Sequence, residues 1–220
     1  TFKKRCRNLH DIDKFFVIGK KMMLDLINFD KYFKKISSIT GWLKYDIYRK
    51  KNIKLFSSEA EEIMSKYGDF YLFSSNYGAL SNQGLNARMK FDKQLQEAKN
   101  SKNKQNNYIT FKNAIKDFKY LKKSLFKFLK KNPKFKLILR PHPADKLYED
   151  WNVFDQFENV KVIKKYDIVP WILASKGLIH RGCSTSMDAY FLNKPVYYFL
   201  PNRKVLNYEK NLTYKISKKI

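Results

Sequence analysis

Residues 177–200, GLIHRGCSTSMDAYFLNKPVYYFL, contain the pattern that decides the fold. The apolar run 177–180 predicts a buried strand, and the small residues after it predict a tight turn. Residues 186–192 predict a helix, which the Asn-Lys-Pro sequence at 193–195 ends, and 196–200 predict the next strand. A strand, a helix and a strand in so short a stretch indicate a βαβ unit with parallel strands.

The same alternation runs through the rest of the chain. Strands are predicted at 15–19, 36–40, 69–77, 135–139 and 160–163, and helices at 20–35, 57–67, 86–98, 109–131 and 168–175. The helix at 109–131 has apolar residues at intervals of three and four, which predict a face packed on a core: Phe111, Ile115, Phe118, Leu121, Leu125 and Leu129. The polar residues 99–107 predict an exposed loop. This order of elements predicts an α/β fold with a doubly wound parallel sheet.

The composition indicates a folded, strongly basic protein. The 220 residues are 44% hydrophobic, which is enough for a core, and their formal net charge is +26. Seven of the 46 basic residues are Arg, and the rest are Lys. Such a surface attracts anions, although solvated Lys faces explain the same composition. The two cysteines and three histidines have no metal-site spacing, so neither a metal nor another cofactor is expected.

Two segments place polar residues where a predicted strand ends. The first is Arg140-Pro141-His142-Pro143, in which the prolines stiffen the turn. A fixed His and Arg suit a phosphate group, because both donate hydrogen bonds and Arg presents a fork of donors. A purely structural turn is the alternative.

The second segment lies between the strand 177–180 and the helix that follows it. Ser184, Thr185 and Ser186 stand at the predicted helix start, where free N–H groups and hydroxyls bind anions. Ordinary helix capping by Ser is the alternative. Asp188, one turn later, is expected either to accept a hydrogen bond from a ribose hydroxyl or to interact with the helix dipole. We expect the loops of both segments to be neighbours at the carboxyl edge of the sheet, with Asn76, His180 and Arg181 at the rim of the site.

These motifs resemble those of bacterial surface carbohydrate biosynthesis proteins, and more broadly the C-terminal domain of GT-B glycosyltransferases. The resemblance rests on Phe15–Gly19, Thr40–Asp46, Tyr67–Phe70, Asn76 and Arg140–Pro143, in the order in which that family has them. Where the family has Asn-Pro-Arg, this chain has Trp42-Leu43-Lys44, and Lys44 keeps a positive charge without the planar fork of donors that Arg presents.

The His-Pro and Ser/Thr pair also resembles polysialyltransferases, capsule Kdo transferases and CDP-glycerol glycerophosphotransferases. The resemblance implies a Rossmann-like nucleotide-binding domain, in which His142, Ser184 and Thr185 bind the phosphates of a donor. The implied donor is a sugar activated by a cytidine nucleotide. It further implies a lipid-linked or glycan acceptor and a role in capsule, lipopolysaccharide or other surface polysaccharide synthesis.

The chain starts at Thr1, and we interpret it as a fragment of a longer transferase. Residues 1–66 are expected to be a remnant and linker from an N-terminal domain, and residues 67–220 to be the nucleotide-binding domain. The general base is expected to lie in the absent domain, so the fragment should bind its donor without turnover. The expected location is cytoplasmic, with peripheral contact of the basic surface with anionic lipid at the inner face of the membrane.

Two other functions are compatible with parts of the sequence. A sugar-nucleotide epimerase of the same architecture would have the same sheet and phosphate site. A nucleic-acid-binding module would explain the charge and the aromatic residues, but no helix-turn-helix, zinc-finger or RNP motif is found, so no specific nucleic acid partner is expected.

Overall fold

The computed structural model describes residues 9–77, 102–142, 151–164, 167–200 and 212–220. The chain forms two compact units, Thr1–Lys54 and Leu55–Ile220. The helix α5 (Ser57–Tyr67) therefore belongs to the second unit. That residues 1–66 derive from a preceding domain stays a prediction.

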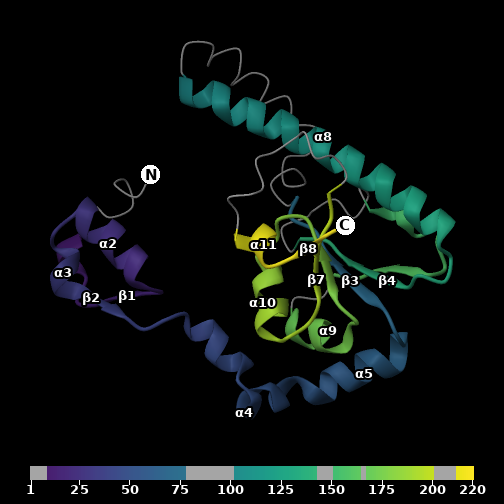
Figure 1. Cartoon of the computed structure of the whole chain (residues 1–220), viewed down its shortest axis with the longest axis horizontal. Helices are drawn as coiled ribbons and strands as arrows, with labels where there is room; N and C mark the ends of the chain where they lie inside the picture. The colour runs from purple at the N-terminus through teal and green to yellow at the C-terminus, as the bar shows by residue number, and fades with distance from the viewer. Residues whose placement is uncertain (1–8, 78–101, 143–150, 165–166, 201–211) are drawn as a thin grey trace. The chain divides into compact units, whose positions relative to one another are not determined.

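The first unit is a small layer of helices on a two-stranded parallel sheet (Figure 1). Its elements are η1 (Leu9–Asp11), β1 (Phe15–Val17), α2 (Lys20–Phe29), α3 (Phe33–Ile36), β2 (Ser37–Ile39), η2 (Leu43–Tyr48) and α4 (Lys50–Ile53). Its core consists of Leu9, Val17, Leu26, Phe33 and Ile36. Both predicted strands of this unit are confirmed.

The helix predicted at 20–35 is divided into α2 and α3. The backbone at Asp30 is extended, and the Asp30 carboxylate accepts a hydrogen bond from the Tyr32 backbone N–H at 2.8 Å. Asp forms such local turns readily, because its short side chain reaches the backbone two residues on. The prediction of one continuous helix was therefore wrong at this point.

The second unit contains a six-stranded, all-parallel sheet in the order β5-β4-β3-β6-β7-β8. The strands are β3 (Tyr71–Ser74), β4 (Leu137–Arg140), β5 (Val160–Val162), β6 (Leu178–His180), β7 (Val196–Tyr198) and β8 (Lys218–Lys219). Five of them lie where apolar runs predicted strands. β8, which consists of two lysines, was not predicted, because it has no apolar pattern.

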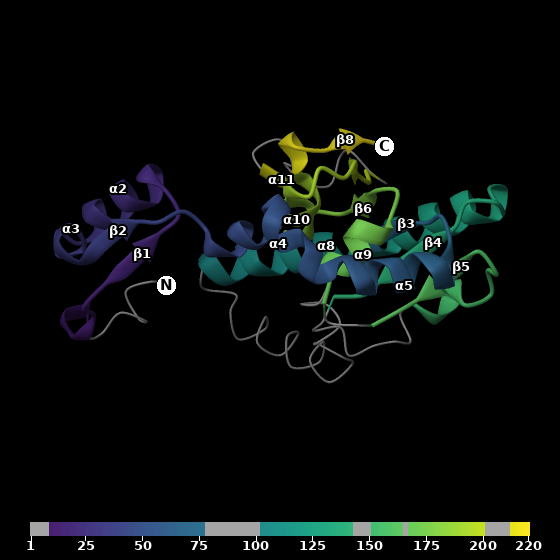
Figure 2. The same ribbon diagram turned by 90° about the horizontal axis from the view of Figure 1, so that it is seen from below.

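Helices cover both faces of this sheet (Figures 1 and 2). On one face the long helix α8 (Lys102–Lys131) packs its residues Phe118, Leu121, Leu125 and Leu129 on Phe73, Leu137, Leu139 and Ile179. On the other face α5 packs against α9 (Val169–Ala174), and α10 (Thr185–Phe191) contacts β6 and β7. The remaining elements are η3 (Lys54–Phe56), η5 (Asn152–Phe154) and α11 (Leu212–Lys215). The predicted doubly wound parallel α/β fold is confirmed.

The helix predicted at 109–131 begins earlier in the structure than its apolar spacing indicated. α8 begins at Lys102, so the loop predicted at 99–107 is helical from that residue on. Lys and Gln are good helix formers, and here they outweigh the Asn residues that suggested a loop. The helix predicted at 86–98 lies outside the described residues.

Candidate functional site

The chain changes direction across the sheet between β3 and β6. From β3 it proceeds through β4 to β5, and it then returns to β6 and continues through β7 to β8 on the other side. In open α/β sheets, ligands bind outside the carboxyl ends of the strands at such a switch point. The carboxyl ends of β3, β4 and β6 meet here, at Ser74, Arg140 and His180, which are paired in register.

The loop after β3 joins the two predicted site segments. The backbone N–H of His142 donates to the Ser75 hydroxyl at 2.9 Å, and the Asn76 side-chain amide donates to the Gly182 carbonyl at 3.0 Å. The Ser74 hydroxyl lies 3.3 Å from the Cys183 sulfur. The two segments were predicted to be direct neighbours, but β3 lies between β4 and β6 in the sheet. Local sequence patterns do not reveal the order of the strands, so this arrangement was not predicted.

Ser75 was missed in the sequence. It is fully buried, and its hydroxyl anchors the loop that presents His142. The polar run Ser74-Ser75-Asn76 directly after an apolar strand indicates a loop at the sheet edge, but only Asn76 in this run was predicted as a site residue.

Arg140 is buried at the end of β4 and bonded within the protein. Its guanidinium donates to the Asp167 carbonyl at 2.9 Å and lies 5.6 Å from the centre of the Trp171 ring. Burial lowers the pKa of Arg140 to about 10, so it remains a cation at neutral pH. Arg140 thus connects β4 to the start of α9 and places a buried positive charge at the carboxyl edge of the sheet. His142, two residues further, is half-buried, and Pro143 lies outside the described residues.

The loop after β6 makes a turn that requires glycine. Gly182 has a φ of +71°, a conformation that side-chain-bearing residues rarely adopt. A Cβ there would also lie 3.3 Å from the Tyr198 hydroxyl. This turn leaves Ser184 exposed and Thr185 half-buried at the start of α10.

Ser186 and Asp188 point into the protein. The Ser186 hydroxyl donates to the Cys183 carbonyl at 2.7 Å, and Asp188 is buried in α10. Ser184 makes no side-chain capping hydrogen bond. Of the predicted phosphate ligands, His142, Ser184 and Thr185 are therefore the ones that retain solvent-facing surface.

Arg181 lies beneath this loop in a buried ion pair. Its guanidinium donates to both carboxylate oxygens of Asp117 in α8, at 3.0 and 2.5 Å. The Tyr77 hydroxyl donates to the same carboxylate at 2.5 Å, and burial together with this negative charge raises the pKa of Tyr77. The loops after β3 and β6 are thus connected to the helix that covers the sheet.

His180 is fully buried in a fixed tautomer. The Ser217 hydroxyl donates to the Thr213 carbonyl at 2.6 Å, so the 2.9 Å contact between His180 Nε2 and Ser217 Oγ requires the proton on Nε2. Nδ1 has no hydrogen-bond partner among the described residues. Burial, followed by the charge of Arg181, lowers the pKa of His180 to about 3. His180 therefore stays neutral and holds β6 to the segment before β8.

We expect His180 to make the second unit sensitive to acid. Unfolded His binds a proton near pH 6.5, whereas the folded residue does not until about pH 3, so stability present above pH 6.5 is lost as the pH falls through this window. Between pH 7 and 5, His180 should account for a loss of about 2 kcal/mol in the free energy of unfolding, at roughly 1.4 kcal/mol per pH unit. Urea unfolding of the wild type and His180→Phe at both pH values measures this difference. Replacing His10, which belongs to the first unit, is the control and should leave the loss in the second unit unchanged. Equal pH dependence of the wild type and His180→Phe would contradict the assignment.

The described residues contain no group of three or more His, Cys, Asp or Glu side chains able to hold a metal ion. In the same part of the chain, no helix has both the length and the apolar character needed to cross a lipid bilayer. An apolar groove of about 330 Å³ is lined by residues that include Tyr71, Phe128, Phe135 and Tyr197. With this lining it is not suited to a phosphate group.

The fold places the second unit in the class of α/β proteins with a doubly wound parallel sheet. No protein-family model matches the chain, and no curated protein matches its sequence. Solved structures that match it include two of the wall teichoic acid polymerase TagF, one of them with CDPG. They are 14% and 15% identical to this chain, each with a TM-score of 0.46, and the match covers 91% of this chain. It covers 42% and 44% of the TagF chains, so this chain spans less than half of their length.

Proposed function

We propose that the second unit binds the phosphates of a nucleotide-activated sugar donor at the carboxyl edge of β3, β4 and β6. The unit would belong to a glycosyltransferase of bacterial surface polymer synthesis. One observation carries the proposal: three loops that are far apart in the sequence converge at the switch point and are hydrogen-bonded to one another through Ser75 and Asn76. The motif order in the sequence, independent of this geometry, supports the same class.

The proposed phosphate ligands are the groups that this framework leaves facing solvent. His142 and the hydroxyls of Ser184 and Thr185 can each donate a hydrogen bond to a phosphate oxygen. Arg140 is proposed to contribute its positive charge from beneath the edge, since its Nη1 donates to the Asp167 carbonyl. Ser186 and Asp188 would then shape the turn from inside, as would the Arg181–Asp117 pair.

Such an arrangement acts on the departing phosphate. When the sugar is transferred to an acceptor hydroxyl, negative charge builds up on the leaving phosphate, and fixed donors at this edge would stabilise it. The acceptor must also lose a proton to a general base. We propose no residue of this chain for that step, and we therefore expect donor binding without turnover.

Calorimetric titration of the chain with CMP, CDP, UDP, GDP and ADP tests the proposal. We expect cytidine nucleotides to bind, and His142→Ala and Ser184→Ala each to weaken binding about tenfold or more, because each removes a hydrogen bond to a charged group. Ser65→Ala, which removes an exposed hydroxyl from α5, is the matched control and should bind as the wild type does. Selective binding of UDP or GDP would retain the transferase class with another donor. Absence of binding of all five nucleotides by the folded chain would contradict the site.

A further inference from the structure

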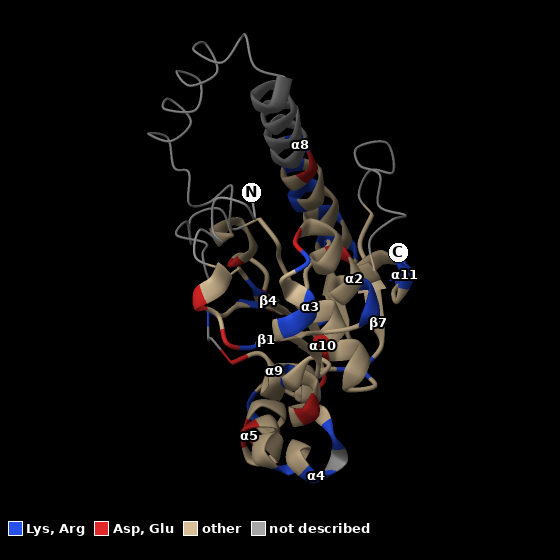
Figure 3. Ribbon diagram, turned by 90° about the vertical axis from the view of Figure 1, so that its left-hand side faces the viewer, with Lys and Arg blue, Asp and Glu red and all other residues tan. Residues whose placement is uncertain are grey.

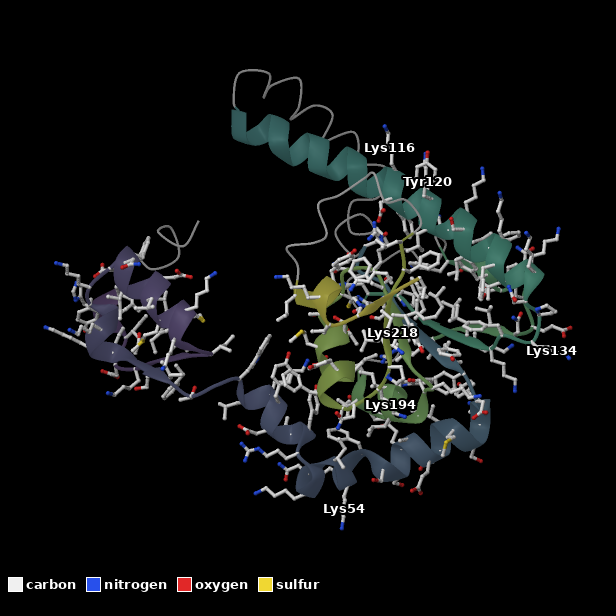
Figure 4. All side chains as sticks on the ribbon, in the orientation of Figure 1. Lys54, Lys116, Tyr120, Lys134, Lys194 and Lys218 are labelled. Carbon is white, nitrogen blue, oxygen red and sulfur yellow. The ribbon has the colours of Figure 1, made fainter. Side chains whose placement is uncertain are left out.

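We propose that the outward face of α8 is a docking surface for an anionic lipid membrane. The surface is a row of six exposed lysines along the described side chains of the helix: Lys116, Lys119, Lys123, Lys127, Lys130 and Lys131. At 100° per residue, all six lie within about 60° of one line along the helix. Lys116 and the exposed Tyr120, which lies on the same stripe, extend away from the sheet in Figure 4.

The opposite side of α8 fixes the direction in which this lysine row faces. Phe118, Leu121, Leu125 and Leu129 are buried against the sheet, so the helix cannot turn its basic side inward. The row spans sixteen residues, and the rise from Lys116 to Lys131 is about 22 Å at 1.5 Å per residue. It is thus a straight, outward-facing line of positive charge on a rigid element.

The charges of the lysine row are not neutralised within the described part of the protein. None of the six lysines forms an ion pair with a described residue. Asp117, the acidic residue within 116–131, is buried and bonded to Arg181. Glu158 lines a groove with Lys130 and Lys134 at one end of the row, and it leaves the middle of the row unaffected.

A general excess of Lys does not explain this pattern, because charge differs between the two faces of the same sheet. α5, on the opposite face, carries Glu59, Glu61 and Glu62 and a single basic residue, Lys66. Figure 3 shows acidic residues on α5 and basic residues along α8. The positive charge is therefore concentrated on the α8 side.

The composition of the row favours a lipid surface over a nucleic acid. Its basic residues are all Lys, which acts as a point charge on a flexible stem, and Arg, the usual reader of phosphate geometry and bases, is absent from 116–131. A planar anionic bilayer attracts such lysines without requiring fixed positions of its phosphates. Tyr120 is of the residue type that is enriched at membrane interfaces.

Vesicle co-sedimentation with the whole chain tests the proposal. The probes are vesicles of phosphatidylcholine alone and vesicles with an equal amount of phosphatidylglycerol. The variant Lys119→Gln/Lys123→Gln/Lys127→Gln removes the middle of the row. The control Lys66→Gln/Lys161→Gln/Lys215→Gln removes three exposed charges from other elements, so both variants have the same net charge.

We expect the wild type to bind the vesicles that contain phosphatidylglycerol and not those of phosphatidylcholine alone. This binding should weaken as salt is added. Since each lysine near the surface contributes roughly fivefold to binding, the row variant should bind on the order of a hundredfold more weakly, with a much smaller loss in the control. Equal losses in both variants would overturn the proposal, because net charge would then suffice. Indifference of the wild type to phosphatidylglycerol would also overturn it, as would tighter, row-dependent binding of an RNA or DNA oligonucleotide. Because neither variant changes His142, Ser184 or Thr185, the result is independent of the proposed donor site.

Discussion

Replacing Asp117 with Asn should lower the free energy of unfolding of the second unit by about 3–5 kcal/mol, as expected when one partner of a buried ion pair is removed. The side chains of Asp117 and Arg181 are each 3% exposed, so water cannot take over the lost interaction. Tyr77 would also lose its charged acceptor. Urea unfolding followed by tryptophan fluorescence measures the loss, because Trp151 and Trp171 are buried in this unit.

The double variant Asp117→Leu/Arg181→Met distinguishes a lost ion pair from general disruption. It removes both charges and leaves apolar groups of similar size, so most of the stability should return. If the double variant is less stable than Asp117→Asn, the pair itself is not the source of the effect. Hydrogen exchange at Gly182–Ser184 adds a local measure, since Arg181 directly precedes this loop. We expect faster exchange in Asp117→Asn at these amides than at β4.

This ion pair also shows where prediction from the sequence ends. Asp117 is 64 residues from Arg181 and 40 from Tyr77, and an acidic residue within a Lys-rich helix has the pattern of a surface charge. Nothing local indicates that it is buried. The sequence likewise predicted His180 and Arg181 at the rim of a site, whereas both side chains are buried.

The elements of the fold were predictable because their signals are local. Short apolar runs predicted β3, β4, β5, β6 and β7. Apolar residues spaced three and four positions apart predicted the buried face of α8. The order of the strands was not predictable, because it depends on which faces the helices cover. Because of that order, the loop after β3, which contains Ser75, lies between the two predicted segments that follow β4 and β6.

The buried face of α8 can be tested with two adjacent residues. Leu121 is fully buried in the core of the second unit, whereas Tyr120 is 48% exposed. Leu121→Ala should therefore cost about 2–5 kcal/mol of the free energy of unfolding, through lost burial and the cavity left behind. Tyr120→Ala removes a larger side chain and should change it by about 0.5 kcal/mol or less.

Urea unfolding in a Trp42→Phe background isolates this comparison, because Trp42 lies in the first unit and would add a separate signal. If helical spacing determines burial, Leu121→Ala costs more stability than Tyr120→Ala, although Leu has the smaller side chain. Similar losses in both variants would mean that α8 is not held on the sheet by this face. The lysine row would then have no fixed direction, so Leu121 also tests the structural premise of the proposed membrane surface.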